Sequence, residues 1–136
     1  MKIHPKPTSR ERGLSLVEIT LVIALMLTLA GIVTYSVSSM TDWREGRSAS
    51  EKLKSVYIAQ RSYLADHPTE STNDLTVSKI IPYLPGSPGS MPVQKSLNDD
   101  VLSIDVSTVP PVFELSDSTY DPSDENDDGL WDVGGL

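Results

Sequence analysis

The chain has 136 residues, with 11 basic and 19 acidic side chains, a formal net charge of −8 and no cysteine. The acidic balance argues against a nucleic-acid partner, because phosphates would be repelled, and the lack of cysteine excludes disulfides. Once an N-terminal anchor is set aside, the length is enough for one small domain.

The N-terminal end combines a basic leader with a long apolar run. Residues 1–13 carry four basic residues and one acidic residue, a net charge of +3, whereas the rest of the chain has 7 basic and 18 acidic residues. Residues 14–37 contain a single charged side chain, Glu18, and about 20 apolar residues are enough to span a bilayer core as a helix. Because basic residues beside an apolar helix stay in the cytoplasm, we expect a cytoplasmic leader and an exported acidic remainder.

The junction between leader and apolar run, residues 13–18, reads Gly-Leu-Ser-Leu-Val-Glu. It resembles the cleavage signature of type IV prepilins and type II secretion pseudopilins, which is Gly, an apolar residue (usually Phe), Ser or Thr, Leu, an aliphatic residue and Glu. Leu14 in place of Phe is a departure that the family often tolerates. The resemblance implies cleavage between Gly13 and Leu14 by a prepilin peptidase and methylation of the new Leu14 amine. It also implies pairing of the Glu18 carboxylate with the terminal amine of a neighbouring subunit.

Two other interpretations of this segment stay open. It could be a secretory signal peptide cut at residues 36–38 (Ser-Val-Ser), or a plain N-terminal anchor. An acid is unusual in a signal peptide, and a carboxylate costs about 2.5–3.5 kcal/mol at the centre of a membrane-spanning helix, though less near its end. Glu18 could also simply favour the helix start through the helix dipole.

The helix is expected to continue as an amphipathic half over residues 38–67. Its apolar face is predicted from residues at three- and four-residue steps: Ala49, Leu53, Val56, Tyr57, Gln60, Tyr63 and Leu64. Gly46 and the Ser38-Ser39 pair are expected to weaken the helix, and Pro68 is expected to end it. Trp43, just past the apolar run, is typical of an interfacial anchor.

Residues 68–136 are predicted to form a small globular C-terminal part. We expect a short helix over 72–81, a turn-rich loop over 82–92, and strands over 101–106 and 111–115 that pair as a hairpin, with a further edge from the tail. These elements predict an α+β fold. The resemblance implies a pilin-like version of it, in which the long N-terminal helix packs on a small antiparallel sheet.

The C-terminal part contains an acidic segment with the pattern D-x-N-x-D-G-x-x-D from residue 124. Oxygen ligands at positions 1, 3 and 5, a glycine at 6, a backbone carbonyl at 7 and an acid at 9 suit Ca²⁺. The predicted ligands are Asp124, Asn126, Asp128, the Leu130 carbonyl and Asp132. Asp117, Asp121 or Asp127 could complete the shell, because Gly135 stands where an EF-hand has its final Glu. The alternative is a solvated, disordered acidic tail, although Trp131 is expected to pack back on the domain.

Together these features predict a structural protein rather than an enzyme, since no catalytic grouping is identifiable. The prediction is a pilin or pseudopilin subunit of a type IV pilus or type II secretion pseudopilus. Its partners would be copies of itself, related subunits, the prepilin peptidase, inner-membrane assembly machinery and lipid. It would sit in a bacterial inner membrane as a single-pass protein with a periplasmic head, and later in a filament. The alternative is a membrane-anchored or secreted calcium-binding interaction module.

Overall fold

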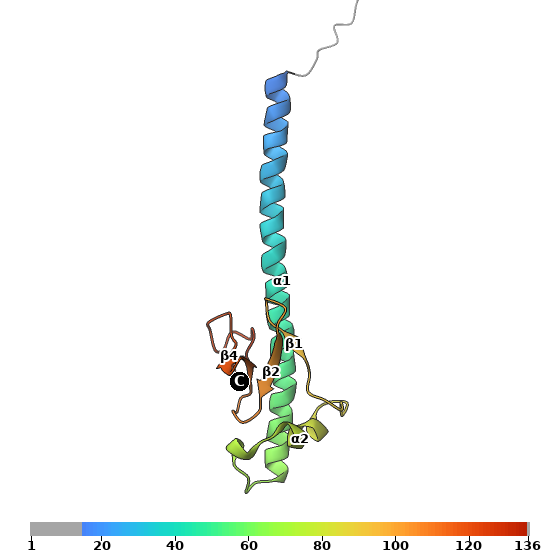
Figure 1. The fold of residues 1–136 in the computed structure, drawn as a ribbon, viewed down its shortest axis with the longest axis vertical. Coiled ribbons are helices and arrows are strands. Elements are labelled where there is room, and N and C mark those ends of the chain that lie inside the picture. Colours follow the sequence, from blue (N-terminus) through green and yellow to red (C-terminus); the bar gives the residue numbers. More distant parts are fainter. Residues whose placement is uncertain (1–14, 136) are drawn as a thin grey trace, which may run out of the picture. The chain divides into compact units, whose positions relative to one another are not determined.

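The computed structural model describes residues 15–135, so Gly13 and Leu14, the predicted cleavage site, lie outside the described residues. The chain divides into two compact units, Met1–Ser38 and Ser39–Leu136. Helix α1 (Leu16–Asp66) supplies residues to both (Figure 1). The two units are described separately below.

The first unit contains the apolar part of α1. Its large apolar side chains are exposed within this chain, and by length and composition this helix could cross a membrane. The threonine hydroxyls in this part bond to carbonyls one turn back, as Thr20 does to Val17 at 2.9 Å and Thr34 to Ala30 at 2.9 Å. These polar groups are therefore satisfied within the helix, which is what a lipid environment requires.

The second unit is built around the other part of α1. The buried residues of the helix are Gly46, Ala49, Ser50, Leu53, Val56, Ala59, Gln60 and Tyr63. The predicted apolar face is confirmed apart from Tyr57 and Leu64, which are half-buried. The helix is continuous through Gly46 and ends at Asp66, before the predicted stop at Pro68. It therefore carries one apolar face along the whole second unit.

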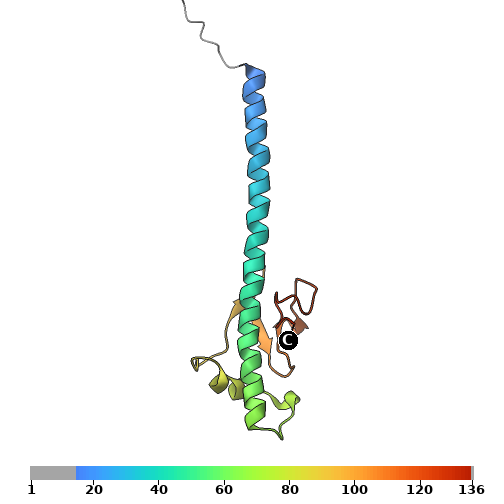
Figure 2. The same cartoon turned by 180° about the vertical axis from the view of Figure 1, so that it is seen from behind.

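A four-stranded antiparallel sheet, in the order β1-β2-β3-β4, packs along this part of α1 (Figures 1 and 2). Its strands are β1 (Gln94–Lys95), β2 (Val101–Asp105), β3 (Val112–Leu115) and β4 (Ser118–Thr119). The predicted hairpin is confirmed, with Ile104 opposite Phe113, and β4 is the predicted edge from the tail. Strand β1 was not predicted.

Between α1 and the sheet the chain forms three short turns rather than the single helix predicted over 72–81. They are η1 (Thr72–Asp74), α2 (Val77–Ile80) and η2 (Ile81–Tyr83). The prediction is wrong because Leu75 and Thr76 adopt extended backbone angles and so interrupt the helix. Ile80 and Leu84 become buried against Val56 and Tyr63 as a result.

Two clusters of buried residues make the core. One joins α1 to the turns. The other joins Leu53 to Phe113 and Trp131, from the sheet and the C-terminal segment. Beside the first cluster, Gln60 donates from Nε2 to the carbonyls of Val106 and Thr108 at 2.8 and 3.0 Å. This pair of hydrogen bonds fixes the chain after β2 to the helix.

Candidate functional site

Glu18, the predicted assembly residue, lies in the first turn of α1 and is exposed. With Ile19, Val22 and Ile23 it lines a small open hollow of about 140 Å³. Within residues 15–135 no side chain pairs with its carboxylate. A positive partner for Glu18 would therefore have to come from elsewhere.

The C-terminal segment is fixed to α1 at Gly46. The Trp131 backbone N–H donates to the Gly46 carbonyl at 3.1 Å, and the Trp131 ring packs edge-on to Tyr120 at 5.2 Å. A Cβ on residue 46 would lie 2.8 Å from Nε1 of Trp131, closer than packing allows. The packing of Trp131 on the domain is confirmed. Gly46, expected to be a weak point of the helix, is instead where the indole ring approaches the backbone.

Asp132 organises the turn that follows. Its Oδ1 accepts backbone N–H groups from Gly129 at 3.0 Å and Gly134 at 2.8 Å. Its Oδ2 is buried and has no hydrogen-bond partner among the described residues. Burial raises the pKa of this carboxyl, and the nearby charges of Asp128 and Asp121 raise it further, against the lowering effect of the two backbone hydrogen bonds. A buried acceptor without a donor costs free energy. A cation bound beside this oxygen would remove that cost.

Only some of the predicted calcium ligands lie in the same hollow. Asn126 and Asp132 line one hollow of about 210 Å³ together with Asp121. Asp128 is exposed, and its Oδ1 instead accepts the Leu130 backbone N–H at 2.7 Å.

The remaining predicted ligands lie outside this hollow. Asp124 is exposed, and the Leu130 carbonyl accepts from the Ser123 hydroxyl at 3.4 Å. Over residues 15–135 no three acidic, histidine or cysteine side chains are close enough to hold a metal. The donor set fits a hard cation by chemistry, and the Asp132 Oδ2 is the atom that supports it; the full ligand set stays a prediction.

A charged hollow of about 430 Å³, not anticipated from the sequence, lies between α1 and strand β1. Lys52 donates from Nζ to the Val93 carbonyl and to Gln94 Oε1, both at 2.7 Å. Arg44, also in its lining, donates to the Met40 sulfur at 3.6 Å and forms no ion pair with a described residue. The signal available in the sequence was the run of basic residues on one helix: Arg44, Arg47, Lys52, Lys54 and Arg61.

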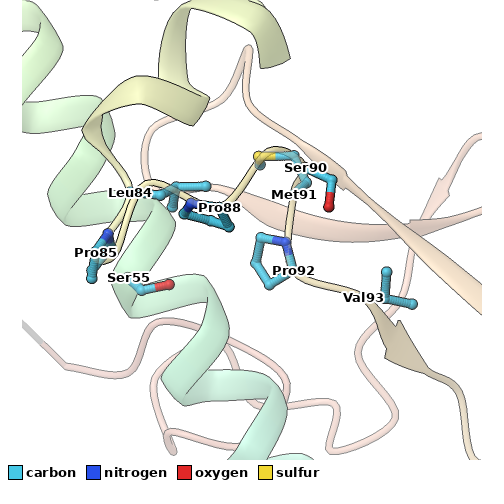
Figure 3. Close-up of a pocket in the computed structure, with 8 residues that line it drawn as sticks. All are labelled: Ser55, Leu84, Pro85, Pro88, Ser90, Met91, Pro92 and Val93. Atoms are coloured by element: carbon cyan, nitrogen blue, oxygen red, sulfur yellow. The ribbon is translucent and has the colours of Figure 1, made fainter.

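A second open hollow of about 400 Å³ lies where the turn-rich loop faces α1. Figure 3 shows Pro85, Pro88, Pro92 and Met91 around it, with Ser55 contributed by the helix. None of its lining residues is ionisable. No charged side chain therefore lines this hollow.

A polar cluster closes the far end of α1. The Glu70 carboxylate accepts from the Tyr63 hydroxyl at 2.8 Å and from Lys79 Nζ at 2.8 Å. The hydrogen bond from Lys79, followed by that from Tyr63, lowers the pKa of Glu70, and the same ion pair raises the pKa of Lys79. These groups satisfy one another, which is typical of a structural cluster.

Comparisons with known proteins do not add to these observations. No family model matches the chain, and no curated protein or solved structure matches it. Function must therefore be inferred from the residues of this chain alone.

Proposed function

We propose that the chain is a structural subunit, a pilin or pseudopilin, of a type IV pilus or type II secretion pseudopilus. The observation that carries the proposal is the apolar part of α1, which is exposed on all sides and holds one carboxylate, Glu18. So large an apolar surface is unfavourable in water and marks a membrane or protein contact. In the proposal a bilayer covers it first and the helices of other copies cover it in the filament.

In this proposal Glu18 is the group through which the helix pairs with a neighbouring copy. Cleavage after Gly13 would create a cationic amine at Leu14, four residues away and at the end of the same apolar segment. A carboxylate in that setting is unfavourable unless it is paired. Pairing Glu18 of one copy with the methylated Leu14 amine of another removes the cost for both groups, and it can happen only after the prepilin peptidase has acted.

The second unit would face outward from the filament, after export to the periplasmic side of the inner membrane. It has no disulfide, and its fold depends on the two apolar clusters and on the contact between Trp131 and Gly46. A calcium ion would add a further tie by binding Asp132 with Asn126, Asp128, Asp124 and the Leu130 carbonyl. Its charge would satisfy the buried Asp132 oxygen.

The start of the mature chain tests the proposal. Mass spectrometry of the protein from membranes and from sheared filaments of its host should give a chain beginning at Leu14 with a methylated amine. A mature chain beginning after Ser38 would instead favour a secreted calcium-binding module. A chain that keeps residues 1–13 and never polymerises would contradict the filament proposal.

Substitution of Glu18 separates insertion from assembly. We expect Glu18→Ala to reach the membrane at the normal level and to be absent from sheared filaments. Thr28→Ala is the matched control, because it also removes a polar group from the apolar segment, but one whose hydrogen bond to Leu25, at 2.8 Å, stays within its own helix. Normal incorporation of the Glu18→Ala chain would refute the role given to the carboxylate.

Calorimetry tests the calcium part separately. We expect Ca²⁺ to release heat on binding the full chain in detergent, and Asp128→Ala to remove that signal. Glu125→Gln is the control, since it changes a neighbouring acid outside the predicted ligand set. A wild-type chain that binds no Ca²⁺ at millimolar concentration would leave the acidic segment as a solvated loop.

A further inference from the structure

Two oppositely charged surfaces lie on the second unit. The first is the charged hollow between α1 and β1, named here the basic hollow, whose cations are Arg44, Lys52 and Lys95. The second is the acidic loop, residues 121–132, which contains six acidic residues and no basic residue. Opposite charges on one kind of chain can pair between copies.

The two surfaces lie at the same level of α1 but on opposite flanks. The acidic loop reaches the helix at Gly46, through Trp131. Arg44 and Ser48, which line the basic hollow, are each two residues from Gly46, so they point about 160° away from it and differ in height by only about 3 Å. In Figures 1 and 2 β1 and the C-terminal segment lie on opposite sides of α1.

The basic hollow keeps positive charge that its own chain does not neutralise. Glu45 and Asp99 also line it, and Asp99 pairs with Lys95 at 3.0 Å. In the described part of the chain no carboxylate forms an ion pair with Arg44 or Lys52. Arg44 is exposed and can therefore meet an acid from outside.

The acidic loop has carboxylates to offer. Glu125 and Asp127 are exposed, and neither side chain makes a hydrogen bond to another described residue. They alternate with Asp124, Asn126 and Asp128, which the calcium hypothesis uses. Binding of a cation by those residues would leave Glu125 and Asp127 available.

We propose that the acidic loop of one copy docks into the basic hollow of the next, with Glu125 and Asp127 facing Arg44. The proposal rests on the filament function and names one of its contacts between subunits. Because the two surfaces differ and lie on opposite flanks at one height, copies standing side by side repeat the contact without closing a pair. A contact of this heterologous kind gives an open helical chain when its rotation does not close into a ring, and it does not give a two-fold dimer.

Cysteine cross-linking in the full chain tests the geometry, on a background with no native cysteine. The pair Ser48→Cys with Asp127→Cys places one thiol on each surface and leaves Arg44 and Glu125 in place. Mild oxidation of membranes and filaments should give a ladder of dimers, trimers and larger species. Ser62→Cys with Asp127→Cys is the control, because Ser62 lies on the same flank but about 21 Å further along α1.

Charge reversal tests the chemistry. Arg44→Glu alone and the double change Glu125→Lys with Asp127→Lys should each reduce sheared filaments by at least about tenfold, because like charges then face each other. Producing the two variants together should restore filaments, since each reversed surface then meets an opposite charge. Arg61→Glu, an equal charge change on α1 outside the hollow, should leave filaments unchanged.

The outcomes distinguish failure of the docking contact from failure of the filament function. Dimers without a ladder, an equal ladder from the Ser62 control, or failure of the mixed variants to recover would each overturn the docking contact. If Glu18→Ala still abolished filaments in that case, the filament function would stand without it. A wild-type chain that forms no filament would overturn both.

Discussion

The two parts of α1 contain similar apolar residues but differ in where their contacts come from. Leu27, in the first unit, is 68% exposed, whereas Leu53, in the second unit, is fully buried. Leu53 packs against the sheet and the C-terminal segment of its own chain. Among residues 15–135 the chain therefore supplies packing partners for the second part of the helix, whereas the large apolar side chains of the first part stay exposed.

The number and placement of charged residues along α1 produce this difference. In the second unit buried and charged residues alternate around the helix, so one face packs and the other meets water. In the first unit apolar residues cover every side, as in helices that are surrounded by lipid or by other helices.

Matched leucine substitutions should give the largest contrast. Leu53→Ala removes a buried side chain from the cluster with Phe113 and Trp131, and we expect it to lower the free energy of unfolding by about 2–5 kcal/mol. Leu27→Ala should leave that free energy unchanged. Chemical denaturation of the full chain in detergent, followed by Trp131 fluorescence, measures both.

An equal loss in the two variants would contradict the comparison. It would mean that the apolar part of α1 contributes to the fold of the second unit. Trp43 is exposed, so a Trp43→Phe background keeps the signal specific to the buried indole in both measurements.

Gly46 and Gly31, both in α1, give the same contrast between the two units, with a smaller expected change in stability. A Cβ at position 46 meets Trp131 Nε1 at 2.8 Å and Leu130 Cβ at 3.3 Å, whereas one at Gly31 meets nothing within 4 Å. Overpacking costs about 1–3 kcal/mol, and alanine recovers about 1 kcal/mol of helix propensity. We expect Gly46→Ala to be destabilising by about 1 kcal/mol, and Gly31→Ala to leave unfolding of the second unit unchanged.

The fluorescence emission of Trp131 reports on the Gly46 and Gly31 substitutions. Gly46→Ala should shift the Trp131 emission toward that of an exposed indole, because the ring must move away from the helix. A Gly46→Ala chain that is more stable than wild type, with unchanged emission, would show that the ring adapts without cost.

Much of this fold could be predicted from short-range patterns. The periodicity of Leu53, Val56 and Tyr63 gives the buried face of α1, Pro68 gives its end, and alternation gives the β2–β3 hairpin. Strand β1 has only two residues, and it pairs with β2 through a register, Gln94 opposite Leu102, that no local pattern specifies. Local patterns predict one helix over 72–81, and they miss the extended angles at Leu75 and Thr76 because these accompany the burial of Ile80 in the core.

The candidate sites also divide into those that local spacing predicts and those that depend on contacts between distant parts of the chain. The sequence locates Glu18 and the acidic segment, because each depends on residue spacing. It does not reveal that Gly46 receives Trp131, or that Arg44 and Lys52 share a hollow with β1, since those contacts join residues far apart in the chain. Spacing also does not predict that Asp128 Oδ1 accepts the Leu130 N–H.

The smallest predicted effect lies at the far end of α1, where the contacts to the helix are polar. Glu70 accepts from Tyr63 and Lys79, so its pKa in the folded chain lies below the ordinary 4.5. In the pH range just below 4.5 the unfolded chain binds more protons than the folded chain, and stability therefore rises with pH there. We expect wild type to be slightly more stable than Glu70→Gln at pH 7, and this advantage to disappear as the pH falls through the folded pKa.

The effect should be small because Glu70 and Lys79 are each about one third exposed, and water and salt weaken such a pair. Thermal unfolding of both chains between pH 3 and pH 7, at low and high salt, measures it. Asp99→Asn is the control, since its partner Lys95 is four residues away on an exposed surface, and it should change the midpoint at neither pH. If the advantage of wild type over Glu70→Gln increased on acidification, the sign would be wrong, and the cluster would be stabilised by its apolar contacts rather than by the charge of Glu70.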